Sequence, residues 1–266
     1  MGVVGLIVGL AKGTTFSNFG ATVATDIAKN PLLAAIVATA FAYEGWITAT
    51  SINSEIKNSK RNLPIALVGG TIYKQAVLEG IAATRADTET ILDGGKINNM
   101  TPLDVQKIVN LKHAWEFILN KYVITSKFGF NIICEINRLV EEGFYYNAGK
   151  VRSVPVSIGG STYKPPLPIE SVVREEIDEI LTSGMPDDDK AVLLMLYLMK
   201  KQIFIDGNKR TAVIAANHLL ISHGFGIIAI PEDKVGEYKK LLIDYYEGKD
   251  EQRIIGFIKK FCIDKL

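Results

Sequence analysis

The chain has 266 residues, a formal net charge of +1 and 48% hydrophobic residues, enough for one large or two small domains with a substantial core. A net charge this close to zero gives no reason to expect a nucleic-acid partner, so no nucleic-acid contact is predicted. Cys134 and Cys262 are far apart and lack a metal-type spacing, which argues against a disulfide framework and indicates reduced core thiols of a cytosolic domain.

Charge is spread unevenly along the chain. Residues 1–72 carry five Lys or Arg and three Asp or Glu, whereas the rest of the chain is rich in both. The apolar run at residues 1–11 is too short to cross a bilayer and no small-residue cleavage site follows it, so we expect no signal peptide. Residues 31–52 have Glu44 as their only charge, and their length suits a membrane-spanning helix. A buried helix of a soluble protein is the alternative.

The stretch FAYEGWITATSINSEIKNSKRNLPIAL closely resembles amino-acid permeases of the APC superfamily, over about residues 15–70. The resemblance implies one transmembrane segment and the loop after it, too little for a transport pathway. Lys57, Lys60 and Arg61 follow the span, and the positive-inside rule places that flank in the cytoplasm. We therefore expect residues 1–72 to supply at most an anchor, which ties a cytoplasmic domain to the inner face of the cell membrane.

The second part, residues 73–266, is predicted to be mainly α from the spacing of its apolar residues. Caps and apolar faces predict helices at residues 73–83, 101–119, 126–142, 169–181, 187–201, 209–221, 234–246 and 252–261. The helix at 187–201 is apolar nearly all round, so we expect it at the centre of the domain.

Residues 150–168 change to a strand-like pattern, in which Val154, Val156 and Ile158 alternate with polar or small neighbours. Gly159-Gly160 is a strong two-residue turn signal. The segment therefore predicts a small β-hairpin.

Residues 202–212, QIFIDGNKRTA, join two predicted helices through an Asp-Gly break. The free N–H groups and the positive end of the second helix favour an anion in front of them. Arg210 can grip a phosphate with two parallel hydrogen bonds, and Asp206 is a hard oxygen ligand for a magnesium ion that bridges to phosphates. The predicted nucleotide-binding residues are Gly207, Asn208, Lys209 and Arg210. A plain helix corner with an Asn N-cap is the alternative.

This motif resembles the Fic/Fido signature H-P-F-x-D/E-G-N-G/K-R, and the resemblance covers about residues 73–262. It implies a Fido-type helical bundle whose hairpin is a flap, with Ile158, Gly159 and Gly160 registering an extended target segment beside the phosphates. It implies ATP and Mg²⁺ as cofactors, and transfer of AMP (AMPylation) to a Ser, Thr or Tyr hydroxyl of a protein. Members that resemble the Doc toxin share the lysine at Lys209 and transfer phosphate, which stays open. A homodimer also stays open.

One position departs from the signature, because Gln202 stands where the family has its histidine. That histidine is the general base for the target hydroxyl, and a carboxamide cannot accept a proton near neutral pH. His113, His218 and His223 are not evident substitutes. The resemblance thus implies catalytic positions at Gln202 and Arg210 in a candidate adenylyltransferase that lacks its usual base. A catalytically weak nucleotide-binding regulatory module is the remaining alternative.

The stretch LEGIAAT resembles the inhibitory helix of Fic proteins, S/T-x-x-x-E-G/N, with Glu79 and Gly80 at its last two positions. In the family this glutamate pairs with a second arginine, where the chain has Val213. Lys209 and Arg210 are the possible replacements as its partner. A solvated glutamate before a glycine C-cap is the alternative.

Overall fold

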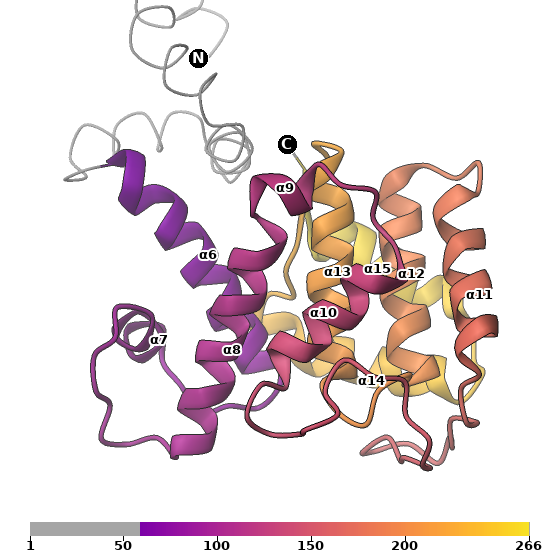
Figure 1. Cartoon of the computed structure of the whole chain (residues 1–266), viewed down its shortest axis with the longest axis horizontal. Helices are drawn as coiled ribbons and strands as arrows, with labels where there is room; N and C mark the ends of the chain where they lie inside the picture. Colours follow the sequence, from indigo (N-terminus) through magenta and orange to yellow (C-terminus); the bar gives the residue numbers. More distant parts are fainter. Residues whose placement is uncertain (1–58, 266) are drawn as a thin grey trace, which may run out of the picture.

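A computed structural model describes residues 59–265, and Figure 1 shows that they form a helical bundle. The elements are α6 (Ser59–Leu78), α7 (Arg85–Leu92), α8 (Pro102–Ile118), α9 (Lys121–Ile124), α10 (Phe130–Val140), α11 (Glu170–Thr182), α12 (Asp187–Lys201), α13 (Asn208–Ser222), β1 (Gly226–Ile228), η1 (Glu232–Lys234), α14 (Val235–Tyr246), α15 (Glu251–Phe261) and β2 (Ile263–Lys265). The predicted span at residues 31–52 lies outside the described residues. No helix within residues 59–265 is long and apolar enough to cross a membrane.

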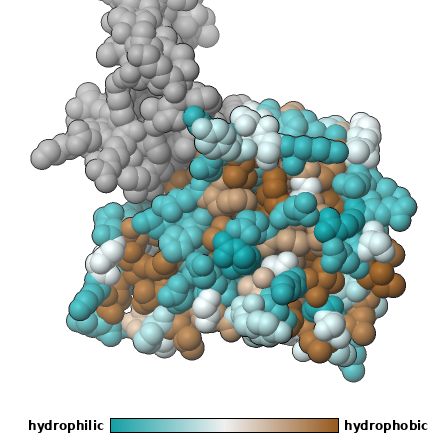
Figure 2. Space-filling model, viewed as in Figure 1, coloured by the Kyte–Doolittle hydropathy of each residue, from teal (hydrophilic) through white to brown (hydrophobic). Residues whose placement is uncertain are grey.

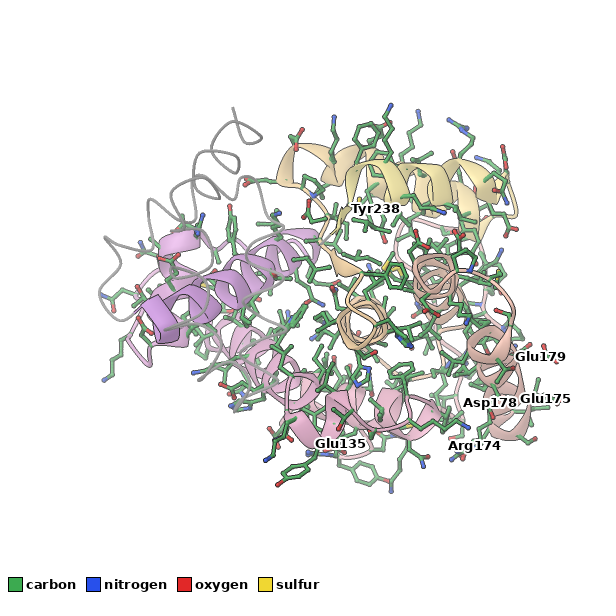
Figure 3. The ribbon with its side chains drawn as sticks, turned by 90° about the horizontal axis from the view of Figure 1, so that it is seen from above. Glu135, Arg174, Glu175, Asp178, Glu179 and Tyr238 are labelled. Carbon is green, nitrogen blue, oxygen red and sulfur yellow. The ribbon has the colours of Figure 1, made fainter. Side chains whose placement is uncertain are left out.

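Helix α13, and not α12 as expected, forms the centre of the bundle, since every residue from Arg210 to Ile221 is buried, whereas α12 is buried on part of its surface. It packs against α12, α10, α8 and β1, and Figure 3 shows it nearly end-on with helices on all sides. Tyr238 of α14 is fully buried and donates a hydrogen bond to the Met199 Sδ of α12 (3.3 Å). A helix buried on all faces needs apolar residues all round, which explains why α13 lacks one polar stripe.

Most helices form where the sequence predicts them. Helix α8 begins at Pro102 with Thr101 as N-cap, whose side chain accepts a hydrogen bond from the Asp104 N–H. Helices α7 and α9 are not predicted. Thr84 and Asp87 form a capping box at the start of α7, a signal that is weak because the helix has only eight residues.

The predicted hairpin at residues 150–168 is wrong as a strand pair. Its turn forms, with the Ser161 N–H donating to the Ile158 carbonyl (3.2 Å) and Gly160 at φ +82°. The two arms do not pair, because Pro155, Pro165 and Pro166 lack N–H groups. Hereafter "flap" means residues 150–168.

The sheet of the described residues lies elsewhere and is antiparallel, with Ile227 opposite Asp264 and Ile228 opposite Ile263. No strand is predicted from the sequence at β1 or β2. Asn217 of α13 accepts from the Ile228 N–H (2.8 Å) and donates to its carbonyl (2.9 Å), which satisfies the buried edge of this strand.

Helix α6 runs through the predicted junction between residues 72 and 73. Ile72 and Ala76, on either side of that junction, are fully buried in the same core. The division of the chain into residues 1–72 and 73–266 stays a prediction.

The outer surface of the bundle carries scattered apolar side chains among hydrophilic ones (Figure 2). Exposed examples near the start of α11 are Leu167, Ile169 and Val172. Single exposed apolar residues are normal on soluble domains and need no functional explanation.

Candidate active site

The predicted anion-binding loop lies between the end of α12 and the start of α13. Gln202 is the C-cap of α12 at φ 49°, and within residues 59–265 it alone has a positive φ without being a glycine. Gly207, at φ 72°, precedes the first turn of α13. The left-handed backbone conformations of these two residues reverse the chain direction between the helices. The N-terminus of α13 is therefore beside the loop, and its first N–H groups have no partner within the helix.

Asn208 folds the loop with its side chain. Its Oδ1 accepts from the Phe204 N–H and its Nδ2 donates to the Phe204 carbonyl, both at 2.9 Å, in a buried position. The side chain is therefore used within the loop, which leaves the backbone N–H of Asn208 as the group for a further ligand.

Asn137 of α10 holds the loop in place by hydrogen bonds of its side chain. The sequence did not indicate this role. Its Nδ2 donates to the Asp206 carbonyl (3.0 Å) and to the Thr211 hydroxyl (3.1 Å), and its Oδ1 accepts from the Gly149 N–H (2.9 Å). One buried amide thus joins the loop, α13 and the segment that leads into the flap.

Three carboxylates surround the side chain of Arg210. Its side chain is only 6% exposed, and its Nη2 is 2.8 Å from Glu141 Oε1. Glu79 Oε2 is 3.7 Å from its Nε, and Asp206 Oδ1 is 3.7 Å from its Nη2. Of the two cations left open as partners of Glu79, the structure places Arg210 beside it. Gly80 follows at φ +78°, as a glycine after a helix end does.

Glu141, just after α10, is the residue of this network that the sequence did not indicate. Burial raises the pKa of its carboxyl group to about 7, against the lowering effect of Arg210 and with further raising by Asp206 and Glu79. A Cβ on residue 207 would lie 2.4 Å from Glu141 Oε1, so Gly207 is required for this close approach. The 2.8 Å contact pairs the two charges without the alignment of a hydrogen bond.

Buried polar atoms around Arg210 are left without hydrogen-bond partners among residues 59–265. They are Arg210 Nη1, Glu79 Oε1 and Glu141 Oε1. Such atoms are costly unless water or a ligand satisfies them, so the centre of this network is built to accept further polar groups.

Gln202 points its carboxamide back to its own helix. Its Nε2 donates to the Met199 carbonyl (2.6 Å), and its backbone carbonyl accepts from the Arg152 Nε (2.6 Å). The residue at the expected base position is therefore held firmly, by a side chain that has no basic atom.

Asp206 faces outward and fits a magnesium ion that is shared with phosphates. Its side chain is 55% exposed, and its Oδ1 accepts from the Gly207 N–H (2.7 Å). Within residues 59–265, no group of three His, Cys, Asp or Glu could hold a metal by itself. Magnesium commonly takes one or two carboxylates with substrate phosphates and water, so this single carboxylate suffices when a nucleotide is present.

The observed contacts of the three histidines are with residues outside the loop. His218 is fully buried against Phe128, its Nε2 is 3.2 Å from the Val123 carbonyl, and burial lowers its pKa. His113 pairs with Glu142, and His223 follows the end of α13. Their observed contacts give none of them the role of general base.

Comparison with known proteins identifies part of the chain. Residues 127–220 match the sequence pattern of the Fic/DOC family, which confirms a Fic domain over that range. The chain is 24% identical over 175 residues, 63% of its length, to "Protein adenylyltransferase fic-1" of Caenorhabditis briggsae. It spans about a third (34%) of that relative's length.

The fold has known counterparts among solved structures. A Fic domain containing signaling protein from Bacteroides thetaiotaomicron superposes with a TM-score of 0.62 at 17% identity, covering 86% of this chain and 91% of that one. The similarity shows that the described bundle has the mainly helical Fic fold.

The permease resemblance has a short counterpart only. A stretch of 44 residues, 16% of the chain, is 46% identical to the "Serine/threonine exchanger SteT" of Bacillus subtilis (strain 168) and covers 10% of that protein. The permease-like segment at residues 15–70 stays a prediction.

Proposed function

We propose that the Fic domain at residues 127–220 works with the rest of the bundle to bind ATP with Mg²⁺ and to transfer AMP slowly to a protein hydroxyl. The observation that carries this proposal is the start of α13, where Gly207 opens the helix N-terminus beside the exposed Asp206 and the guanidinium of Arg210. Helix N–H groups, an arginine and one exposed carboxylate are what a magnesium–triphosphate requires. The related protein named an adenylyltransferase supports the same reaction class.

Each residue has a distinct part in this reaction. The N–H groups of α13 and the Arg210 guanidinium stabilise the negative charge of the phosphates. Asp206 would hold a magnesium ion, which would supply positive charge against the phosphates. The target hydroxyl oxygen bonds to the α-phosphorus, the bond from that phosphorus to the oxygen bridging to the β-phosphate breaks, and pyrophosphate leaves.

Among the described residues, the site has no general base to take the proton of the target hydroxyl. Gln202 is held as the C-cap of α12, and it can orient a hydroxyl by hydrogen bonding but cannot accept its proton. The proton therefore passes to water, and the reaction lacks an assistance typically worth about 10² to 10⁴-fold in rate.

Arg210 is bound by carboxylates before any nucleotide arrives. A phosphate that uses this guanidinium competes with Glu141 and Glu79 for it. The proposed self-inhibition by Glu79 thus acts on Arg210, in place of the second arginine that Val213 replaces.

Two alternatives have their own observations. Lys209, at the mouth of the helix, favours phosphate transfer of the Doc type, and Gln202 favours a nucleotide-binding regulatory module without transfer. Tethering of the domain to the membrane through residues 31–52, and a homodimer, rest on the sequence alone and are further proposals.

Intact-mass spectrometry separates these functions. The full chain is incubated with ATP, Mg²⁺ and a lysate of host proteins, and the masses of the chain and of the acceptor proteins are measured. A gain equal to AMP supports the proposal, and a gain equal to phosphate supports the Doc-type alternative. ATP binding by calorimetry with no mass gain supports the regulatory module.

A further inference from the structure

Arg152, at the base of the flap, is a buried cation that has no acidic partner among residues 59–265. Its side chain is 2% exposed, and its four hydrogen-bond acceptors within the described residues are all backbone carbonyls. Burial lowers the pKa of this guanidinium. A buried charge without a counter-ion is costly, so its carbonyl contacts must together offset a large desolvation penalty.

The four contacts join three separate pieces of chain. The Arg152 Nε donates to the Gln202 carbonyl (2.6 Å), and its Nη1 donates to the Val154 carbonyl in the first arm of the flap (2.8 Å). Its Nη2 donates to Pro166 (2.7 Å) and Pro165 (3.4 Å) in the second arm. Only arginine has a planar fork with enough donors to hold all of these at once.

The backbone of Arg152 makes a fifth contact, because its N–H donates to the Ile203 carbonyl (3.0 Å). It is the second contact with the motif loop, residues 202–207. The arms of the flap do not pair with one another, so no ladder of strand hydrogen bonds sets their spacing. Arg152 therefore fixes both the distance between the two arms and their position relative to Gln202.

We propose that Arg152 is a positioning residue that sets the flap in register with Gln202, and thereby fixes where a protein hydroxyl meets the α-phosphate. The proposal rests on the function proposed above. Reacting groups that are misplaced by about 1 Å can lose ~10²-fold in rate, so a loosened flap should slow transfer to a protein without weakening ATP binding at α13.

The test compares Arg152→Lys with Arg174→Lys in the full chain. Arg174 lies on α11 (Figure 3), where it pairs with Glu170 and stacks over Phe130, away from the motif loop. Both variants lose an arginine fork, but only Arg152→Lys loosens the flap. The probes are ATP labelled on the α- or γ-phosphate, with Mg²⁺ and host lysate proteins as acceptors.

We expect Arg152→Lys to transfer label to protein about 10- to 100-fold more slowly than wild type, with an ATP dissociation constant within about two-fold. Hydrogen exchange should quicken at the turn amides of Ser161 and Tyr163 while α13 stays protected. Arg174→Lys should match wild type in all three measurements.

Other outcomes overturn the proposal. Unchanged transfer in Arg152→Lys removes the positioning role, and an Arg152→Lys chain that does not fold, or that loses ATP affinity together with transfer, assigns Arg152 to the fold alone. If wild type and Arg174→Lys neither bind ATP nor transfer label, the proposed function fails, and this inference fails with it.

Discussion

Glu141 Oε1 lies 2.8 Å from Arg210 Nη2, in a contact where both side chains are almost fully buried. The pair joins the end of α10 to the first turn of α13, directly beneath Gly207. The guanidinium that the proposed function assigns to ATP phosphates is therefore already matched by a carboxylate within the chain.

Removing the charge of Glu141 should strengthen ATP binding. In Glu141→Gln, phosphates no longer compete with a buried carboxylate for Arg210, and charge-assisted contacts of about 1.5 to 3 kcal/mol correspond to roughly 10- to 100-fold in affinity. Calorimetric titration with ATP and Mg²⁺ measures the change. Glu142→Gln, at the exposed neighbouring position, is the matched control and should bind as wild type does. Equal affinities of the two variants would show that Glu141 does not restrain Arg210.

The same carboxyl group should make folding stability depend on pH. Its pKa is raised by burial from an ordinary 4.5 to about 7, so the folded chain holds this proton more tightly than the unfolded chain. Its stabilising contribution is fully present below about pH 4.5 and is lost as the pH rises through about 7. We expect Glu141→Gln, which stays neutral, to gain in free energy of unfolding relative to wild type between pH 5 and pH 8. Urea denaturation at both pH values measures this, and a pH-independent difference would contradict the shifted pKa.

Arg210 itself should be required for nucleotide binding. Arg210→Ala removes the charge-assisted hydrogen bonds to phosphate and should weaken ATP binding by about 1.5 to 3 kcal/mol. Arg85→Ala is a control, since it removes an exposed arginine on α7 that pairs with Glu89. Calorimetry that finds the same ATP affinity in Arg210→Ala and wild type would remove the phosphate role.

The sequence predicts the helices of this site better than the contacts between them. Thr101 and Pro102 mark the start of α8, and the aspartates at residues 187–189 mark the start of α12, because caps and dipole partners are local signals. Glu141 and Glu142 look alike in sequence, as two charges before the Gly143 helix end. The packing of α10 on α13 decides that one is buried against Arg210 and the other is exposed.

The flap shows a second limit of sequence reasoning. Alternating residues and Gly159-Gly160 predict a hairpin, and the turn does form. The arms do not pair as strands, and a buried arginine, Arg152, connects them by donating to carbonyls in both arms. Such a long-range contact has no local pattern in the sequence.

Residues 1–58 should be dispensable for the fold of the bundle. We place the cut after residue 58, because α6 begins at Ser59 and its Ile72 is fully buried in the core. If residues 31–52 anchor the chain, the truncated protein should move from the membrane fraction to the soluble fraction and keep its helical circular dichroism. A truncated chain that stays with the membranes would rule out that anchor, and loss of helical signal would show that the two parts share a core.

The central claim is that the chain retains the phosphate-binding half of the site and lacks its base at Gln202. Gln202→His restores an imidazole at that position and should raise transfer of AMP to protein by about 10² to 10⁴-fold, with ATP affinity unchanged. Gln252→His, at an exposed position of α15, is the matched control and should match wild type. The decisive measurement is the rate of label transfer from α-labelled ATP in these three proteins. Gln202→His alone should transfer label rapidly, whereas wild-type transfer as fast as that of Gln202→His would show that the chain does not lack a base.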